Sequence, residues 1–315
     1  MARLALLERR MRCYGLGPRL EGMSNPILEL SNALASAVEG AGKSVVRVDA
    51  GRWTGSTGVV WSSDGLVVTA AHALRRSDVE VTLPGGQTLE AAVVGHDPGT
   101  DLALLKLEAT GLAVPEWAEP EGLRVGQVVL ALGWPGKHLR ASLGILGNVA
   151  GEWRTPAGGR LERYVQPDVS LYPGFSGGPL LDAEGRFVGL NTQALRRGLT
   201  LTLTLPTLRR ITERLQKHGT ARRGYLGVGA QPVRLPEGAG QSVGLLLVSV
   251  EPGSPAERAG LLVGDVLLAL DGKALGRLEE LLGILADLPA GTQARLKLWR
   301  GGQSLELEVT LGERQ

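Results

Sequence analysis

Hydrophobic and polar residues alternate with a period of two along much of the chain between residues 44 and 205. Turn clusters such as Pro84-Gly85-Gly86 and Asp97-Pro98-Gly99 separate the short runs. The pattern predicts two sets of six strands, with a looser stretch from Glu108 to Leu123 between them. The predicted strands are Ser44–Asp49, Thr57–Ser62, Leu66–Ala70, Val79–Leu83, Glu90–Val94 and Leu102–Leu107, then Gln127–Leu132, Ala141–Val149, Leu161–Gln166, Pro179–Asp182, Arg186–Asn191 and Thr200–Leu205. Two sets of nearly equal length favour two barrels packed together.

Helical spacing appears on both sides of these strands. Apolar residues from Pro26 to Glu39 recur at helical intervals, and Gly40 and Gly42 are expected to end that helix. We expect it to pack on the surface of a domain or on a neighbouring subunit. The basic stretch Pro206–His218 predicts a second helix, interpreted as an exposed connector to another domain.

The last ninety residues change character and mix both periods. Val243–Val250 and Asp265–Asp271 are predicted strands, Pro255–Ala259 a short helix, and Arg277–Leu288 an amphipathic helix. A final hairpin is predicted from the alternation in two further segments, Thr292–Trp299 and Ser304–Leu311. This pattern is typical of a small α+β domain.

Composition narrows the function classes. The 315 residues suffice for two or three domains, and 43% hydrophobic with 21% charged residues is ordinary for a globular chain. A net charge of +2 without a basic block argues against nucleic acid as a partner, and Cys13 alone allows no intrachain disulfide. No run of about 18 apolar residues exists, so no transmembrane helix is predicted.

The first 23 residues lack the pattern of a signal peptide, because charges follow the short apolar run Leu4–Leu7 at once. We interpret residues 1–23 as a disordered or spurious extension. The expected location is the cytoplasm, or the periplasm or exterior if the true start differs.

One stretch suggests covalent chemistry: Gly174-Phe175-Ser176-Gly177-Gly178. Glycines let the backbone take conformations that a Cβ forbids, so amide groups can converge beside the serine hydroxyl. Acyl transfer needs that arrangement, with a hydroxyl to attack a carbonyl and amides to hold the oxyanion. Such a stretch on its own is more often just a turn.

A base and an orienting acid are also present. His72 ends an apolar strand among small residues, whereas His96, His138 and His218 lie in polar turns or the connector. Asp101 opens an apolar strand, where a partly buried carboxylate needs a hydrogen-bonding partner, and His72 is a candidate. The histidine and aspartate fall in the first strand set and the serine in the second, which predicts a site between two barrels.

Three motifs resemble those of the HtrA family, the DegP- and DegS-like serine proteases of chymotrypsin fold. They are Thr69-Ala70-Ala71-His72, Gly99-Thr100-Asp101-Leu102-Ala103-Leu104-Leu105-Lys106 and Gly174-Phe175-Ser176-Gly177-Gly178-Pro179-Leu180. Residues 222–312 resemble the PDZ domain of that family through Tyr225-Leu226-Gly227-Val228, Ser254–Leu261 and Gly264–Leu268.

The resemblance implies a mostly β fold, with a chymotrypsin-like double six-stranded β-barrel protease domain followed by a small α+β PDZ domain. The expected division of the chain is an extension at 1–23, an N-terminal helical segment at 24–42, the protease domain at 43–205 with barrels at about 43–118 and 122–205, a linker helix at 206–221 and the PDZ domain at 222–312.

The resemblance also implies residue roles. Ser176 is the expected nucleophile, His72 the base and Asp101 the group that orients the histidine. The oxyanion hole is expected at Gly174, Phe175 and Ser176. Residue 175 is commonly Asn in the family, and its replacement by Phe has two interpretations of equal weight. The ring either biases the peptide that carries the Gly174 amide, as a switch, or lies on the cleft wall and shapes the substrate pocket.

The expected function is that of an ATP-independent serine endopeptidase of protein quality control or regulatory proteolysis, which needs no cofactor and no metal. Its partners would be unfolded or partly folded proteins, and C-terminal peptides that bind the PDZ residues Tyr225, Leu226, Gly227 and Val228. The alternative is a latent protease that acts as a peptide-binding, chaperone-like protein. A homotrimer formed through segment 24–42 is a further expectation.

Overall fold

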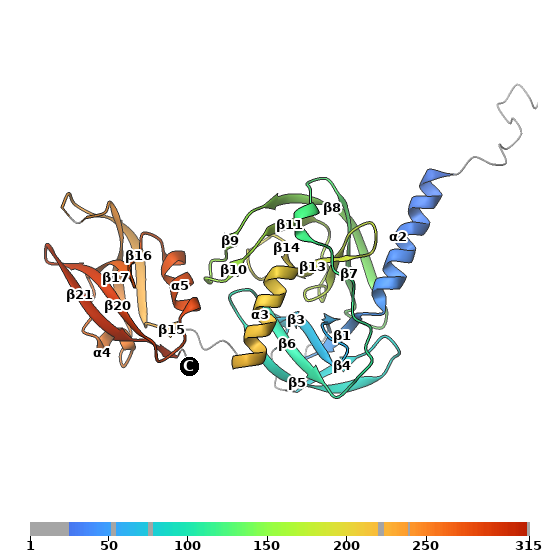
Figure 1. The fold of residues 1–315 in the computed structure, drawn as a ribbon, viewed down its shortest axis with the longest axis horizontal. Coiled ribbons are helices and arrows are strands. Elements are labelled where there is room, and N and C mark those ends of the chain that lie inside the picture. The colour runs from blue at the N-terminus through green and yellow to red at the C-terminus, as the bar shows by residue number, and fades with distance from the viewer. Residues whose placement is uncertain (1–24, 52–54, 75–77, 220–223, 239, 314–315) are drawn as a thin grey trace, which may run out of the picture.

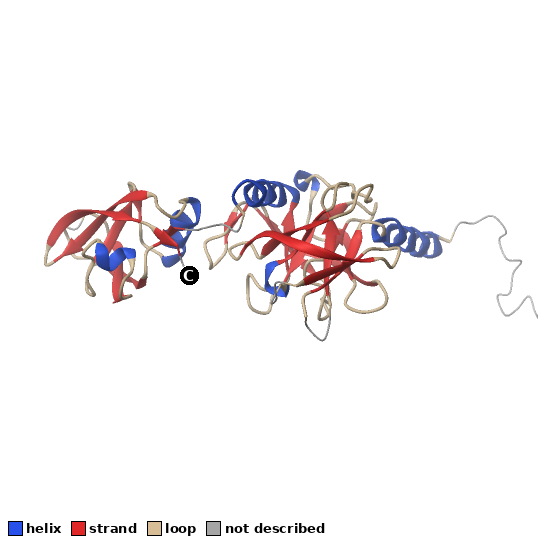
Figure 2. Ribbon diagram, turned by 90° about the horizontal axis from the view of Figure 1, so that it is seen from below, coloured by secondary structure: helices blue, strands red, loops and turns tan. Residues whose placement is uncertain are grey.

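The structure is a computed structural model, which describes residues 25–51, 55–74, 78–219, 224–238 and 240–313. The extension expected at 1–23 lies outside the described residues. Two packed β-barrels form the larger part of the chain, and an α+β unit follows them (Figure 1). Strands dominate both parts, with few helices (Figure 2). The mostly β, two-part architecture expected from the sequence is confirmed.

The first barrel contains all six strands predicted for it and closes in the order β1-β2-β3-β6-β5-β4. Their bounds are β1 Val45–Asp49, β2 Ser56–Val60, β3 Leu66–Ala70, β4 Val79–Thr82, β5 Thr88–Asp97 and β6 Leu102–Leu107. Strand β5 is longer than expected because the pairing with β6 shifts register between Val93 and Gly95 and then continues to Asp97. This longer strand places the turn after it next to the end of β3.

The second barrel is a six-stranded sheet in the order β11-β8-β7-β12-β13-β14, whose end strands β11 and β14 approach each other. Its strands are β7 Val128–Gly133, β8 Arg140–Ala150, β11 Tyr164–Asp168, β12 Pro179–Leu181, β13 Phe187–Thr192 and β14 Leu201–Thr204. A short hairpin of β9 (Trp153–Arg154) and β10 (Arg160–Leu161) was not expected from the sequence. Two 3₁₀ turns, η1 (Ala71–Ala73) and η2 (Pro120–Gly122), complete this part.

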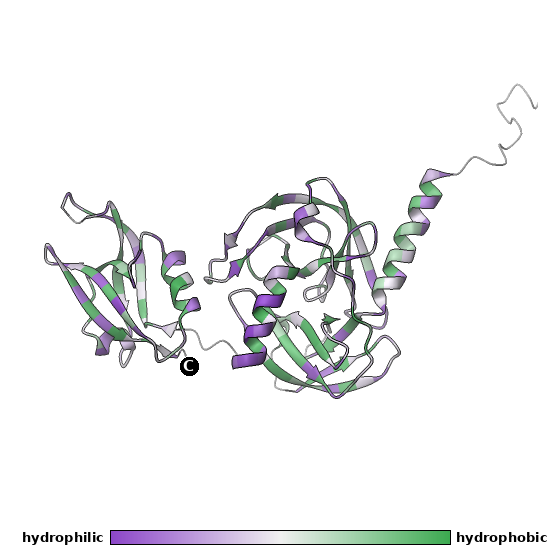
Figure 3. Cartoon of the chain, in the orientation of Figure 1, coloured by the Kyte–Doolittle hydropathy of each residue, from purple (hydrophilic) through white to green (hydrophobic). Residues whose placement is uncertain are grey.

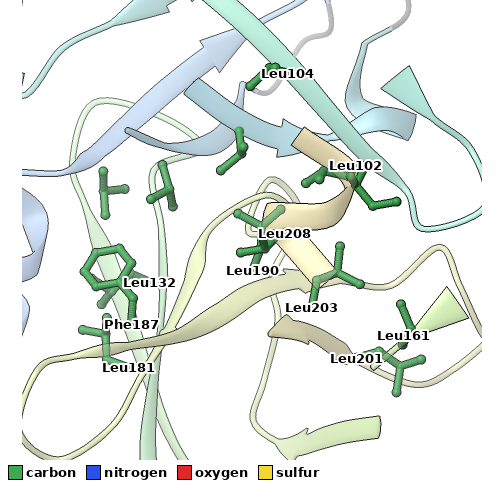
Figure 4. Packing of buried hydrophobic residues seen from close by; sticks show 14 of the residues in the cluster. Leu102, Leu104, Leu132, Leu161, Leu181, Phe187, Leu190, Leu201, Leu203 and Leu208 are labelled. Atoms are coloured by element: carbon green, nitrogen blue, oxygen red, sulfur yellow. The ribbon is translucent and has the colours of Figure 1, made fainter. Parts of the chain in front are cut away.

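One apolar core joins the two barrels. Leucines from both sets of strands meet in it, among them Leu102 and Leu104 from β6 and Leu132 from β7 (Figure 4). Helix α3 (Leu205–His218) inserts Leu208 into the same cluster. Burial of this cluster stabilises the barrels as one body and fixes the position of loops on either side of their boundary.

The exposed connector predicted at 206–218 is wrong in its exposure. Helix α3 buries one face against the barrels, and its exposed residues are polar (Figure 3). The buried residues of this helix are Leu205, Thr207, Leu208, Ile211, Thr212 and Leu215. The arginines had suggested a solvated surface, but their spacing leaves a full apolar stripe between them.

Helix α2 (Pro26–Gly42) confirms the N-terminal helix, which runs through Gly40 to Gly42. Asn25 caps it, because its side chain accepts the amides of Ile27 and Leu28. The second half packs Leu34, Ala37 and Val38 on the barrel core, whereas Ile27, Leu28 and Leu30 at the start are exposed. Among the described residues, no helix is both long and apolar enough to span a bilayer.

The C-terminal unit has a five-stranded path β16-β17-β18-β20-β21 with two helices. The predicted elements appear close to their expected bounds. They are β15 Gly224–Tyr225, β16 Val228–Arg234, β17 Val243–Val250, α4 Pro255–Arg258, β18 Val266–Leu270, β19 Lys273–Ala274, α5 Leu278–Asp287, β20 Gln293–Arg300, β21 Gln303–Thr310 and β22 Gly312–Glu313. Its own core of leucines is separate from that of the barrels.

An ion pair holds the beginning of β18 to the end of β20. Arg300 donates two hydrogen bonds to the Asp265 carboxylate, at 2.6 and 2.7 Å, and the Leu262 amide donates a third at 2.8 Å. Burial alone would raise the pKa of Asp265, but the Arg300 guanidinium and the Leu262 amide outweigh burial and lower it. The loop between α4 and β18 is therefore fixed by a carboxylate that stays ionised.

Candidate active site

His72 and Asp101 meet because of the pairing between β3 and β6. Ala70 at the end of β3 faces Leu102 at the start of β6, so the residues just beyond these ends are neighbours. The backbone extends the ladder by one bond, since the Ala71 amide donates to the Asp101 carbonyl at 2.9 Å. His72 lies in the single turn η1 that follows. The apolar runs recognised in the sequence thus determine where both polar side chains stand.

The Asp101 carboxylate receives hydrogen bonds from three directions. Its Oδ1 accepts the His72 amide at 2.8 Å, and its Oδ2 lies 2.7 Å from His72 Nδ1. The Thr192 hydroxyl, at the end of β13, also donates to Oδ2. The carboxylate is 5% exposed and the imidazole 37%. Asp101 is therefore buried behind a histidine whose ring remains accessible. Its carboxylate fixes the orientation of that ring through Nδ1.

Ser176 lies in the loop between β11 and β12 of the second barrel, but the first barrel holds that loop. The Ser56 hydroxyl donates to the Ser176 carbonyl at 2.8 Å, and the Thr57 hydroxyl donates to the Gly174 carbonyl at 2.6 Å. Both donors are on β2. Behind the loop, Asn191 on β13 exchanges backbone hydrogen bonds with Gly177 and Gly178. The serine is thus fixed from both barrels.

Two glycines in this loop are required by space as well as by conformation. Gly174 has a φ of 87°, and a Cβ there would lie 2.4 Å from the Gly55 carbonyl oxygen. Gly177 has a φ of 86°, and a Cβ there would lie 2.1 Å from the Thr57 carbonyl oxygen. Side-chain residues are strained at these φ values and would collide with backbone.

The amides of the loop divide into two groups. Phe175 donates to the Tyr172 carbonyl, Gly177 to Asn191 and Gly178 to Phe175, at 2.9 to 3.0 Å. Within the described part of the chain, the amides of Gly174 and Ser176 donate to no acceptor. Unpaired amides that flank a serine are the arrangement that binds an oxyanion. Phe175 contributes no amide to this pair, because its own N–H closes the preceding turn.

Two cavities border these residues. One, of about 370 Å³, is bounded by Ser176, His72 and Gly174 together with β1 and β2 residues such as Val48 and Ser56. The other, of about 360 Å³, is also bordered by His72, together with Asp101. Its lining includes His96, which the sequence had placed in a surface turn, and the apolar residues Pro98 and Leu195. His72 therefore borders both cavities.

Three contributors were missed by sequence reasoning: Ser56, Thr57 and Thr192. Each acts by one hydroxyl on a residue at least 91 positions away. No local pattern distinguishes them from other strand hydroxyls. The segment Leu201–Leu205 is buried, and the Thr202 hydroxyl donates to the Asn191 side chain at 2.8 Å. In the described residues, no group of three or more His, Cys, Asp or Glu side chains could hold a metal ion.

The loop at 225–228 joins β15 to β16 in the C-terminal unit. Gly227 has a φ of 82°, and a Cβ there would meet the Ser254 side chain at 2.3 Å. The amides of Leu226 and Gly227 donate to no acceptor within the described residues. Strand β16 ends the sheet path, so its outer edge faces helix α5 without a strand partner in the described fold.

Comparisons with known proteins agree with this architecture. A model of the trypsin-like peptidase domain matches residues 56–190, and a model of the PDZ domain matches residues 247–300. A probable periplasmic serine endoprotease, DegP-like, from Pseudomonas putida (strain W619) is 36% identical over 267 residues, which cover 81% of this chain and 55% of the relative. A DegP-like relative from Chlamydia muridarum is 33% identical over 273 residues. The chain spans about half the length of the curated relatives it matches.

Solved structures give the same result. The HtrA-type protease AlgW with a decapeptide superposes with a TM-score of 0.71 at 26% identity, covering 89% of this chain and 98% of that chain. A serine endoprotease from Yersinia pestis also gives 0.71, at 28% identity, with the same coverage. The chain belongs to the HtrA family of serine proteases. The family resemblance drawn from the three sequence motifs is confirmed.

Membership in the HtrA family corrects one expectation. The curated relatives are named periplasmic endoproteases, which contradicts the cytoplasmic location expected from residues 1–23. That expectation assumed that residues 1–23 indicate the cellular location of the protein. The location named for the relatives is the stronger evidence.

The HtrA-family departure at residue 175 has a structural explanation. The Phe175 ring is fully buried in the second barrel, edge-on to Tyr172 and against Gly133, where a Cβ would lie 2.3 Å from the ring. Val129, Ala131 and Leu180 are in the same apolar cluster. The interpretation of the ring as part of the cleft wall is therefore wrong. The buried ring anchors the loop to the core of the second barrel, while the amides of Gly174 and Ser176 stay unpaired among the described residues.

We expect Phe175→Asn to lower both stability and turnover. Replacing the ring leaves a cavity and buries the carboxamide of the new Asn side chain without hydrogen-bond partners. Together these cost about 3 kcal/mol or more of unfolding free energy. We also expect the turn that presents the Gly174 amide to loosen, because the buried ring no longer anchors it. Thermal unfolding and hydrolysis of unfolded casein measure the two effects, and Phe175→Leu, which keeps an apolar side chain, is the milder control. A rise in basal turnover at unchanged stability would instead support the switch interpretation.

Proposed function

We propose that this chain is a serine endopeptidase that cleaves unfolded or exposed polypeptide and depends on neither ATP nor a cofactor. One arrangement carries the proposal: Ser176 borders the same cavity as a histidine held by a buried aspartate, and unpaired amides flank the serine. The names of the relatives, which are serine endoproteases, support it independently.

The proposed reaction follows from these positions. Ser176 Oγ attacks the carbonyl carbon of a peptide bond while His72 takes its proton. The amides of Gly174 and Ser176 hold the oxyanion of the tetrahedral intermediate. His72 then gives the proton to the leaving amine as the C–N bond breaks. Water releases the acyl group by the same steps, and Asp101 keeps the imidazole oriented and stabilises its charged form.

The alternative, a latent protease acting as a peptide-binding protein, has less support. It depended on Phe175 spoiling the oxyanion hole, but the buried ring leaves the Gly174 and Ser176 amides unpaired. A homotrimer formed through segment 24–42 stays a prediction. The exposed Ile27, Leu28 and Leu30 at the start of α2 are the feature that favours it.

The PDZ unit is proposed to bind the C-terminal end of a polypeptide. A terminal carboxylate fits the unpaired amides of Leu226 and Gly227, in the loop that begins at Tyr225 and ends at Val228. The peptide would add as a strand to the free edge of β16, with helix α5 as the other wall. AlgW, a structural relative, was solved with a decapeptide, which supports peptide binding in this family.

We predict that Ser176→Ala removes proteolysis without altering the fold. Loss of the nucleophile from such a site lowers kcat on the order of 10⁴-fold or more. The measurement is digestion of unfolded casein by the purified full chain, with unfolding temperature as the control for folding. Casein digestion at the wild-type rate by a folded Ser176→Ala variant would remove Ser176 from the mechanism.

We also predict that PDZ binding requires a free carboxylate. Removing one charged acceptor costs about 1.5–3 kcal/mol, which corresponds to roughly 10- to 100-fold in Kd. Fluorescence anisotropy on the full chain carrying Ser176→Ala compares one apolar C-terminal peptide with the same peptide as its C-terminal amide. Equal affinity for both forms would contradict carboxylate capture.

A further inference from the structure

Helix α3 carries an arginine that enters the protein instead of facing water. The Arg214 side chain is 27% exposed, and its Nη2 lies 3.1 Å from Oδ2 of Asp97, whose side chain is 1% exposed. Sequence analysis had treated this arginine as part of a solvated basic face. Because α3 packs across β5 and β6, Arg214 instead reaches the end of β5.

Asp97 organises the turn that leads to Asp101. Its Oδ2 accepts the Thr100 hydroxyl at 2.7 Å, and its Oδ1 accepts the Gly99 amide at 3.3 Å. The Thr100 amide also donates to the Asp97 carbonyl at 3.3 Å. The buried Asp97 carboxylate therefore holds both Gly99 and Thr100. These residues directly precede Asp101, which contacts His72.

Asp101 needs such support because its backbone is strained. Its φ is 56°, one of two positive values among the non-glycine residues that the structure describes. This left-handed conformation is unfavourable for a residue with a Cβ and persists where its surroundings impose it. The Asp97 turn on one side and the β3–β6 ladder on the other impose it here. Loosening the turn lets Asp101 relax and moves its carboxylate away from His72 Nδ1.

We propose that Arg214, acting through Asp97, is a positioning residue for Asp101; the inference rests on the proposed endopeptidase function. A buried carboxylate is costly unless a positive charge or hydrogen bonds compensate it. Removing the guanidinium takes away compensation at Oδ2, so the carboxylate is drawn toward solvent and pulls on the 97–101 turn. The helix that leads to the PDZ unit thereby fixes the acid of the catalytic site.

The same helix offers a matched control one turn earlier. Arg210 donates a hydrogen bond to Glu162 Oε1 at 2.6 Å, in an arginine–carboxylate pair that faces the β10–β11 segment. Arg214 Nη2 lies within ion-pair distance of Asp97 but makes no hydrogen bond among the described residues, so the two pairs share charge and not geometry. Burial alone would raise the pKa of Glu162, but Arg210 and Thr207 outweigh it and lower that pKa. Arg210→Gln removes an arginine and an ion pair from α3 without touching the Asp97 turn.

The test compares Arg214→Gln, Arg214→Lys and Arg210→Gln in the full chain. Hydrolysis of a fluorogenic decapeptide from β-casein gives kcat and KM separately. We expect Arg214→Gln to lower kcat about tenfold or more at unchanged KM, since small displacements of catalytic groups cost up to roughly 100-fold. Arg214→Lys keeps the charge and should recover most of the loss, and Arg210→Gln should keep the wild-type kcat. Asp97→Asn should reproduce the Arg214→Gln defect.

A second measurement does not depend on turnover. The His72 Nδ1 proton, hydrogen-bonded to Asp101, gives a downfield NMR signal that is identified by its loss in His72→Gln. We expect this signal to weaken in Arg214→Gln and to remain in Arg210→Gln. If wild type and Arg214→Gln share the same kcat, or only KM changes, the positioning role is overturned while the proposed function stands. If the wild type hydrolyses no peptide, the proposed function fails, and an unchanged signal in Arg214→Gln would overturn the positioning role as well.

Discussion

The antiparallel pairing of β3 with β6 is the constraint on which the site depends. It brings the residue after one strand next to the residue before the other, so that the Asp101 carboxylate can accept both the amide and the ring Nδ1–H of His72. Neither side chain could hold this position from a free loop. The strained backbone at Asp101 is tolerated because the ladder and the Asp97 turn hold it on both sides.

The second requirement is that both barrels hold the loop that carries Ser176. Ser176 belongs to the second barrel, yet hydroxyls of Ser56 and Thr57 in the first barrel hold the carbonyls on either side of it. These two hydroxyls hold the carbonyls of Gly174 and Ser176, while the amides of the same two residues remain unpaired in the described chain. Phe175 further restrains the loop that carries Ser176, because its buried ring resists rotation of the preceding turn.

The sequence predicted what depends on local pattern and missed what depends on long-range contact. The period of two located the barrel strands, and three short motifs located His72, Asp101 and Ser176, because glycines and small residues are required next to them by backbone geometry. Thr192 and Thr57 could not be found, since a strand hydroxyl becomes informative only when folding brings it to its partner. Arg214 and the helix that carries it were misjudged for the same reason: basic residues suggested solvent, and the buried stripe between them faces a core that no local pattern reveals.

The central claim is that Ser176 is a nucleophile activated by His72, and covalent labelling tests it most directly. The full chain is treated with a fluorophosphonate, and peptide mass spectrometry locates and quantifies the adduct. The account predicts one adduct per chain, on Ser176, and a rate that falls strongly in His72→Ala. An adduct elsewhere, no adduct on a folded chain, or equal labelling rates in wild type and His72→Ala would contradict it.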